Sequence, residues 1–350
     1  MVPDNKSFFN NQTGGQSGLI GYLLISALIF IVLVGMHETA YLINMLILSL
    51  ILAMIGTPLL YWLKEKGMSD FVSVGIIMVL YAFSILAFIL LIYASGNLFV
   101  SNLPEYHSLL ETRLAGLNEM LSKIGITFDS IQDLATNLGT ISKVTVSLVG
   151  ELSFLLMNGF FIFVITSFLL LEIPDLGRRF EKITNGEKRL SEKYQEMCNS
   201  MIKWLYVKTK TNLVLGACFG GLLYAMGVDL AIFWGVLAVI LSYIPYIGLI
   251  LVAIPAIILA WIQLGIGGVI IVAAGICIIN AVVENVVFSK FAADDFNMPP
   301  LVVVVSLVLW TWVLGPVGML ISVPFTLMIL IALSYNEKTK WITILLGIDK

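Results

Sequence analysis

Long runs of apolar residues recur along most of the chain, and they limit the folds that are open to it. A helix needs about 20 apolar residues to cross the hydrocarbon core of a bilayer, and several runs reach this length. Only 12% of the 350 residues are charged, and the mean hydropathy is +1.02, whereas about a quarter of a soluble domain is charged. The alternating segments of a membrane β-barrel do not occur in the sequence. The sequence therefore predicts an all-α polytopic membrane protein.

The charges between the apolar runs predict which segments face the cytoplasm. Positive residues favour the cytoplasmic side, which places Lys64, Lys66 and the basic segment 172–210 inside. Two spans separate these sites, so both can lie on the same side of the membrane. Both chain ends are then cytoplasmic, in a multi-pass protein of the cell (inner) membrane. The predicted order is a disordered tail at 1–17, spans one to three at 18–100, an extracytoplasmic segment at 101–147, span four at 148–171, the basic segment at 172–210, a C-terminal membrane unit at 211–335 and a tail at 336–350.

The extracytoplasmic segment carries two helical patterns. Leucine and isoleucine recur at spacings of three and four over 110–124, and again over 131–141 behind the candidate N-cap Asp129. Each pattern predicts an amphipathic helix with a narrow apolar seam. The two helices either pack on each other or form a seam between the subunits of an oligomer.

The stretch 230–262 is too long for one span and too short for two. One helix of about 33 residues would be roughly 50 Å long, against a hydrocarbon core of about 30 Å. Pro245 and Gly248 lie near its centre. Proline fixes φ and lacks an N–H, and glycine allows a positive φ. A re-entrant helical hairpin with its tip at Pro245 and Gly248 fits this length, and an ordinary Pro-kinked span is the alternative.

The apolar run 299–333 repeats this pattern. A Gly/Pro turn lies near its centre, and a second proline, Pro324, follows it as Pro255 follows the first turn. The repeat predicts a second re-entrant hairpin. The residues of its predicted tip are Gly315, Pro316 and Gly318.

The two predicted hairpins enter the membrane from opposite sides. One unbroken span, 267–288, separates them, so charge parity makes the second helix-plus-hairpin unit an inverted repeat of the first. Inverted repeats with broken helices near the bilayer midplane are typical of secondary transporters, because irregular backbone is tolerated where it lines a polar cavity. The prediction is about eight membrane elements, in which 211–335 forms a transport unit and both hairpin tips flank a small polar site.

Polar side chains within the apolar runs are the candidate binding residues, because they are costly there. Asn280 and Glu284 are four residues apart and therefore share a helical face, on which they would bind a proton, a cation or a polar solute. The alternative is that Glu284 pairs with Lys208, Lys210 or Lys290 as a cytoplasmic anchor. The candidate substrate- or ion-binding residues are Glu284, Asn280, Asn285, Lys208 and Asn212.

Other polar positions have simpler expectations. Lysines at a cytoplasmic helix end, such as Lys208 and Lys210, usually contact lipid headgroups. Asp229 is expected to cap the first arm of the first hairpin. His37 and Glu38 are expected to meet water at the outer end of span one.

Several kinds of chemistry have no support in the sequence. No GxxxxGK[ST], HExxH or GxSxG motif occurs, and the two histidines, His37 and His107, are far apart. The three cysteines form neither a metal-binding nor a disulfide spacing. The net charge of -3 gives no indication of nucleic acid. We therefore expect no enzyme, metal, cofactor or nucleic-acid partner.

Three stretches resemble the autoinducer-2 exporter (AI-2E) family of membrane permeases. They are SYIPYIGLILVAIPAIILA, NAVVENVVF and LVLWTWVLGPVGMLISVPF, and they occur in the family's order and approximate spacing. LILSLILAMIGTPLLYWLKEKG and WLYVKTKTNLVLG are also similar to family segments, so the resemblance covers most of 20–335. The chain departs from the family after the Glu-Asn pair, where a Pro and a Gly usually follow and this sequence has FSKFAADDFN.

The resemblance implies secondary transport across the lipid bilayer by a homo-oligomer, with a pentamer as one stoichiometry. Some members export the quorum-sensing signal autoinducer-2, and others are associated with sodium/proton antiport. We interpret the chain as a secondary transporter that exports a small polar solute such as autoinducer-2 by alternating access, with a proton or sodium ion coupled through Glu284. The alternatives are a monovalent cation (sodium)/proton antiporter and a membrane scaffold that acts through its external helices.

Overall fold

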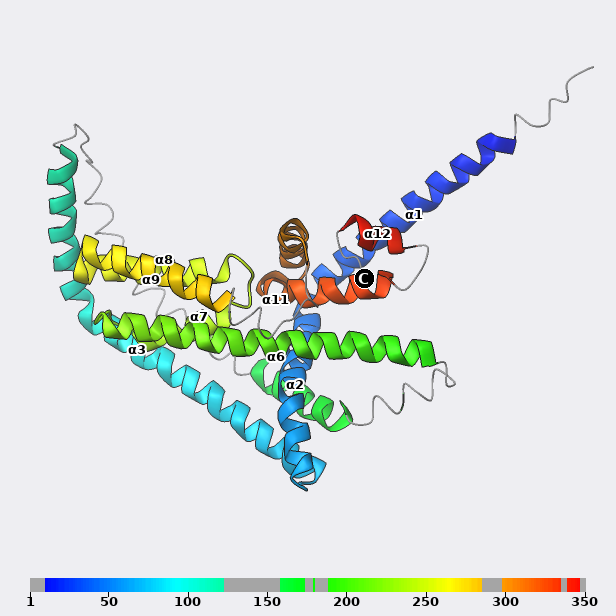
Figure 1. Cartoon of the computed structure of the whole chain (residues 1–350), viewed down its shortest axis with the longest axis horizontal. Helices are drawn as coiled ribbons and strands as arrows, with labels where there is room; N and C mark the ends of the chain where they lie inside the picture. The colour runs from blue at the N-terminus through cyan, green and yellow to red at the C-terminus, as the bar shows by residue number, and fades with distance from the viewer. Residues whose placement is uncertain are drawn as a thin grey trace, which may run out of the picture.

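The computed structural model describes residues 10–122, 158–173, 179, 188–284, 298–334 and 339–346, and the regular elements among them are helices (Figure 1). The all-α prediction is confirmed for this part of the chain. The N-terminal half contains α1 (Asn10–Glu38), α2 (Ala40–Glu65), α3 (Asp70–Ser122) and an unlabelled helix, Asn158–Ile173. The C-terminal half contains α6 (Lys188–Ala225), α7 (Ala231–Leu241), α8 (Gly248–Leu264), α9 (Ile266–Val282), α11 (Pro300–Ser334) and α12 (Lys340–Leu345).

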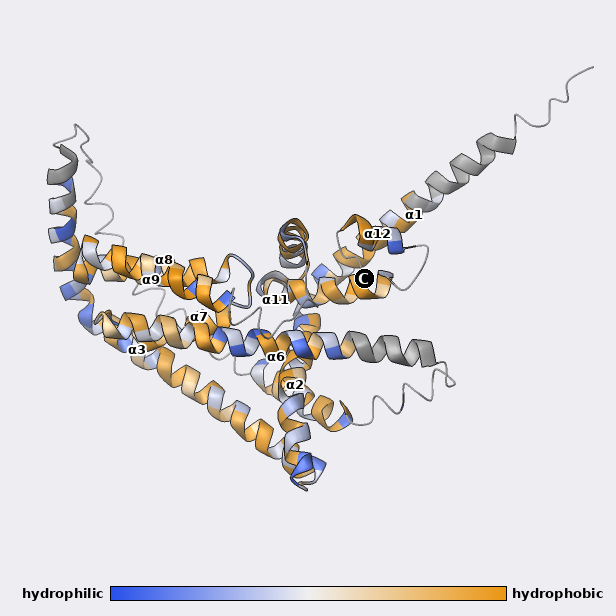
Figure 2. Cartoon of the chain, in the orientation of Figure 1, coloured by the Kyte–Doolittle hydropathy of each residue, from blue (hydrophilic) through white to orange (hydrophobic). Residues whose placement is uncertain are grey.

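The outer surface of the helices is apolar, as lipid requires. Apolar residues cover most of the ribbon in Figure 2, and large side chains such as Phe71 and Leu301 are 79% and 74% exposed. The helices α2 and α11 and the part of α3 that ends at Gly116 are long and apolar enough to cross a membrane. Together with several shorter apolar helices, they make the chain a multi-pass membrane protein.

Two helices continue across boundaries that the sequence predicted. α3 does not end near residue 100 but runs on to Ser122 through Pro104, and its last part bends away in Figure 1, as an internal proline favours. The first amphipathic pattern, 110–124, is therefore part of α3 as far as Ser122, and its last two residues and the second pattern, 131–141, lie outside the described residues. α6 likewise joins the end of the basic segment to the fifth span without a break.

Helix α1 begins earlier and packs less than a first span would. It starts at Asn10, within the stretch expected to be a disordered tail. It runs away from the other helices in Figure 1, and apolar side chains such as Leu24 and Leu28 are about 60% exposed. Leu33 and Met36, near its C-terminal end, pack against α11 and α2. Much of its apolar surface is thus left uncovered by the other helices that the structure describes.

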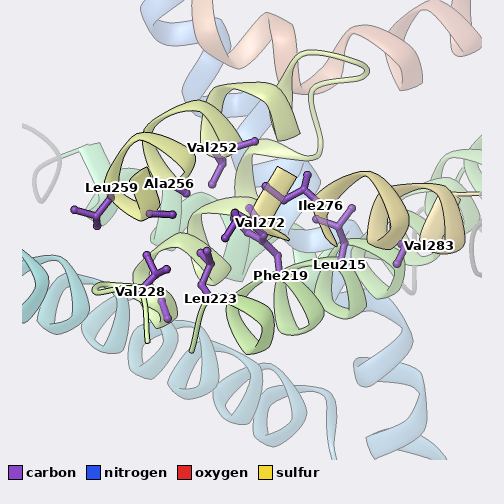
Figure 3. Close-up of a cluster of buried hydrophobic side chains, with 14 of the residues drawn as sticks. Leu215, Phe219, Leu223, Val228, Val252, Ala256, Leu259, Val272, Ile276 and Val283 are labelled. Carbon is purple, nitrogen blue, oxygen red and sulfur yellow. The ribbon is translucent and has the colours of Figure 1, made fainter. Parts of the chain in front are cut away.

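Helices α6 to α9 form a bundle with a core of their own (Figure 3). Three glycines bring α6 and α7 close together, because a Cβ atom on Gly216 would lie 2.5 Å from the Gly235 oxygen, and one on Gly235 would lie 3.0 Å from Gly220 Cα. Small residues allow such close approach between membrane helices. The core residues labelled in Figure 3 are Leu215, Phe219, Leu223, Val228, Val252, Ala256, Leu259, Val272, Ile276 and Val283.

The chain turns sharply at both proline–glycine patterns. Six residues connect α7 to α8, and a Cβ atom on Gly248 would lie 1.8 Å from the Leu241 oxygen, so the two arms nearly touch there. α11 breaks at Gly315, whose φ and ψ are 64° and −146°. Trp310 Nε1 donates to Thr326 Oγ1 over 3.0 Å, although these residues would be about 24 Å apart along a straight helix. α11 therefore consists of two arms that fold back on each other.

Candidate functional site

An ion pair joins α6 to the end of α9. Lys208 Nζ lies 3.0 Å from Glu284 Oε1, and Glu284 lies in a short π-helical turn that continues α9. Lys208 is only 8% exposed, whereas 39% of the Glu284 side chain is exposed. A buried charge is costly unless it is paired, so the carboxylate stabilises the lysine in its apolar surroundings. Of the three lysines that the sequence allowed as partners of Glu284, Lys208 therefore forms the pair.

A buried amide lies one helical turn from this lysine. Asn212 is fully buried, and its Nδ2 donates to the Val239 oxygen of α7 over 3.2 Å. Its Oδ1 has no hydrogen-bond partner among the residues described. A buried polar atom without a partner is rare in folded proteins and is a candidate contact for a ligand or ion. Lys208, Asn212 and Glu284 thus form the polar cluster that the structure brings together.

The first turn is attached to α6 beside this cluster. The hydroxyl oxygen of Tyr243 lies 2.6 Å from Thr209 Oγ1, one residue from Lys208. Pro245 and Gly248 belong to this turn, which places the first predicted tip near the polar cluster. Neither Thr209 nor Tyr243 was predicted as a site residue.

The remaining predicted residues are less closely connected to this cluster. Asn280 lies one turn before Glu284 on α9 and is partly exposed, and Asn285 lies outside the described residues. Lys210 stacks over the Tyr206 ring at 4.1 Å. The second predicted tip packs with α1 and α2 in a separate apolar cluster. The arrangement in which both hairpin tips flank one polar site remains a prediction.

No group of three His, Cys, Asp or Glu residues in the described ranges is placed to hold a metal ion.

The second turn binds side chains from the N-terminal half. His37 Nδ1 lies 2.8 Å from the Trp312 oxygen, and the two rings stack with centroids 5.5 Å apart. Asn44 Nδ2 donates to the Leu314 oxygen over 3.0 Å. The expectation that His37 only meets water was wrong, because its partner is a carbonyl oxygen 275 residues away that no local pattern reveals.

Asp229 joins α3 to the base of the first hairpin. It does not cap α7, because Leu230 occupies the N-cap position with φ of 62° and no side chain makes a cap bond. Its Oδ2 instead accepts hydrogen bonds from Tyr106, Asn102 and Gln263 at 2.6, 3.2 and 2.5 Å. Tyr106 donates its hydroxyl proton in this contact, because a carboxylate oxygen only accepts.

A cavity of about 360 Å³ lies beside Asp229, between α3 and the connection from α6 to α7. Its walls are mostly apolar. Among the described residues that line it, Asp229 carries the charge. The sequence did not indicate this cavity, because its two walls are more than 120 residues apart in the chain. Residues that line it include Leu91, Ser95, Leu98, Tyr224 and Phe233.

Comparison with known proteins identifies the family. The sequence model of the AI-2E family transporters matches residues 23–337. The chain belongs to the AI-2E transporter family. The Lys208–Glu284 pair, the two broken segments and the helices from α2 to α11 lie within the matched region, so these features belong to the family domain.

Three relatives in the AI-2E family match over nearly their whole length. The AI-2 transport protein TqsA of Escherichia coli (strain K12) is 30% identical over 327 residues, which cover 93% of this chain and 95% of TqsA. A Haemophilus influenzae protein, provisionally named as a transport protein, is 30% identical with the same coverage. YhhT of E. coli, also provisionally named for transport, is 28% identical over 93% of both chains. These names support a membrane transport role, in line with the expectation that the chain is no enzyme.

Proposed function

We propose that this protein is a secondary transporter that exports a small polar solute such as autoinducer-2 by alternating access, and that a proton or sodium ion is coupled through Glu284. The Lys208–Glu284 pair carries the proposal, because it places a nearly buried lysine against a carboxylate between apolar helices. Ionisable residues within membrane helices commonly mark substrate and ion pathways. The printed name of TqsA supports autoinducer-2 as the solute to test first.

The pair has the chemistry of an exchange site. A proton or sodium ion that binds Glu284 competes with the lysine for the same carboxylate. When a cation takes the place of Lys208 on Glu284, the buried ammonium loses its carboxylate partner, which is costly. Asn212 Oδ1 lies one helical turn away without a hydrogen-bond partner in the described structure. The proposed cycle moves the ammonium between Glu284 and Asn212 as the ion binds and leaves.

The rest of the proposal concerns the arrangement in the membrane. The two broken segments would be re-entrant hairpins that enter from opposite faces as an inverted repeat, with both termini cytoplasmic in the inner membrane. Asn280 and Asn285 would line the solute path with the two tips. The uncovered apolar surface of α1 supports a homo-oligomer, in which a second copy covers part of it.

The decisive experiment is flux through the purified protein in liposomes. Efflux of autoinducer-2 and movements of sodium and protons are measured under imposed ion gradients. Glu284→Gln should abolish the ion dependence, and Lys208→Gln should weaken it at least about tenfold, because each removes one charge of the pair. Lys210→Gln is the matched control on the same helix and should retain coupling. Full ion coupling in Glu284→Gln would remove Glu284 from the mechanism.

A monovalent cation/proton antiporter is the second candidate, because an ion pair of this kind serves ion exchange without any organic solute. The same liposomes distinguish the two functions. Sodium-dependent pH changes without autoinducer-2 efflux would favour the antiporter, whereas efflux that depends on an ion gradient would favour the exporter.

A further inference from the structure

The second turn deprives one backbone oxygen of its usual helical donor. Pro316 has no N–H, so it cannot donate to the Trp312 oxygen four residues earlier. A carbonyl oxygen without a donor is strongly disfavoured among apolar side chains. A donor from another part of the chain can therefore stabilise this turn.

Two side chains near the junction of α1 and α2 donate to backbone oxygens of this turn. His37 Nδ1 is 2.8 Å from the Trp312 oxygen, and Asn44 Nδ2 is 3.0 Å from the Leu314 oxygen. Since a carbonyl oxygen only accepts, the proton of a neutral His37 lies on Nδ1. His37 itself is exposed, whereas apolar residues of both parts, among them Ile47 of α2 and Ile321 of α11, pack in one buried cluster, the apolar seat of the turn.

We propose that His37 and Asn44 are positioning residues that dock the second turn on the junction of α1 and α2, with His37 in place of the donor that Pro316 lacks. The docking follows from the contacts alone. Its consequence for transport rests on the proposed function: the two residues set how readily the turn of α11 separates from α1 and α2 during the transport cycle.

Two features of His37 need to be separated in a test, because its ring also stacks on Trp312. His37→Asn keeps a donor nitrogen near the position of Nδ1 and removes the ring. His37→Phe keeps a ring and removes the donor. Asn44→Leu removes the second donor at similar volume, and Asn97→Leu is its matched control, because Asn97 is an exposed asparagine of α3.

The rate of thiol labelling at Val317 reports whether the turn is docked, because Val317 is partly buried in the apolar seat. The full-length chain carries Val317→Cys, with Cys198, Cys218 and Cys277 replaced by serine, and is labelled with a maleimide. His37→Phe and Asn44→Leu should raise the rate about three- to tenfold, the range expected for one lost hydrogen bond. His37→Asn and Asn97→Leu should remain close to the parent rate.

A second reporter distinguishes local undocking from general unfolding. Ile232→Cys, on the exposed face of α7, should label at an unchanged rate in each variant. Unchanged rates at Val317 would overturn the inference, as would equal increases at both reporters. An equal increase in His37→Asn and His37→Phe would assign the docking to ring stacking and overturn the donor role. Absence of autoinducer-2 and ion flux in liposomes would reject the proposed function but would leave this labelling result unaffected.

Discussion

The two broken segments of the C-terminal half use the same device to reverse direction. Each has a proline that is soon followed by a glycine, and each glycine lies against a carbonyl of the preceding arm. A Cβ atom on Gly248 would lie 1.8 Å from the Leu241 oxygen, and one on Gly318 would lie 1.9 Å from the Trp310 oxygen. No side chain larger than hydrogen fits at these distances, so the arms can meet only where glycine lies.

The two turns differ in the side chains that bind their backbone oxygens. Pro245 cannot donate to the Leu241 oxygen, but Ile244 N donates to it over 2.9 Å, and Gly248 N donates to the Ile244 oxygen over 3.1 Å. The first turn thus closes with its own backbone. Two oxygens of the second turn also accept hydrogen bonds from the side chains of His37 and Asn44. Similar sequence patterns have therefore produced turns with different side-chain partners.

This difference determines what each turn is attached to. The first hairpin is bound to α6 through Asn212 and Thr209, within the α6–α9 bundle. The second is bound to α1 and α2. A movement of the bundle relative to the N-terminal helices would carry the first turn with it and leave the second in place. The comparison teaches that two similar breaks can be attached to different helices.

The largest expected effect comes from the feature that the two turns share. Gly248→Ala and Gly318→Ala should each abolish most of the folded protein, because the added Cβ would overlap a backbone oxygen that cannot move without opening the turn. The measurement is the yield of monodisperse protein in detergent and its thermal unfolding midpoint.

Two glycines serve as controls for these variants. Gly221→Ala and Gly267→Ala should be tolerated, because no atom lies within 4 Å of the Cβ that would be added. A stable Gly318→Ala variant beside an unstable Gly248→Ala variant would show that the second turn is looser than the first. The need for glycine where the arms meet would then not be common to both turns.

The local features of this fold, its helices and its first turn, could be predicted from the sequence. The length of 230–262 and the residues Pro245 and Gly248 indicated a turn, and a six-residue turn connects α7 to α8 there. Apolar runs predicted the helices, because a chain in lipid must satisfy its backbone within each segment. The ends of α3 and α6 were misjudged, since charged and apolar residues can share one helix.

The contacts between distant segments could not be predicted in the same way. The absence of an N–H at Pro316 implies that the Trp312 oxygen needs a donor, but nothing near it in the sequence points to His37. Asp229 was expected to act within its own turn and instead binds Tyr106, 123 residues earlier. Such pairings depend on how helices pack, and a single sequence carries no periodic signal for them.

The attachment of the first turn to α6 should have a moderate effect on stability. Tyr243→Phe removes a hydroxyl that lies 2.6 Å from Thr209 Oγ1, so it should lower the free energy of unfolding by about 1 kcal/mol. Tyr243→Phe combined with Thr209→Val should lose less than the sum of the single variants, because neither hydroxyl is then left unpaired. Chemical denaturation of the three variants measures this coupling. Strict additivity would show that the contact does not hold the turn.

Backbone strain should have opposite effects on stability in the two turns. Tyr246 has a φ of 61° in the first turn, a conformation that costs a residue with a Cβ roughly 1 kcal/mol. Tyr246→Gly should therefore raise the unfolding free energy slightly, by up to about 1 kcal/mol after the entropy of the unfolded glycine is counted.

The second turn already has glycine at its strained position, so the reverse substitution should destabilise it. Gly315→Ala places a Cβ at φ of 64° and ψ of −146°, a region that is essentially restricted to glycine, at a cost of about 1–3 kcal/mol. Open space around Gly315 excludes a steric clash as the cause. Thermal unfolding of both variants checks the signs. Equal signs would mean that the strain of the first turn is needed to close it with its own backbone, and the contrast between the two turns would then lie in conformation as well as in attachment.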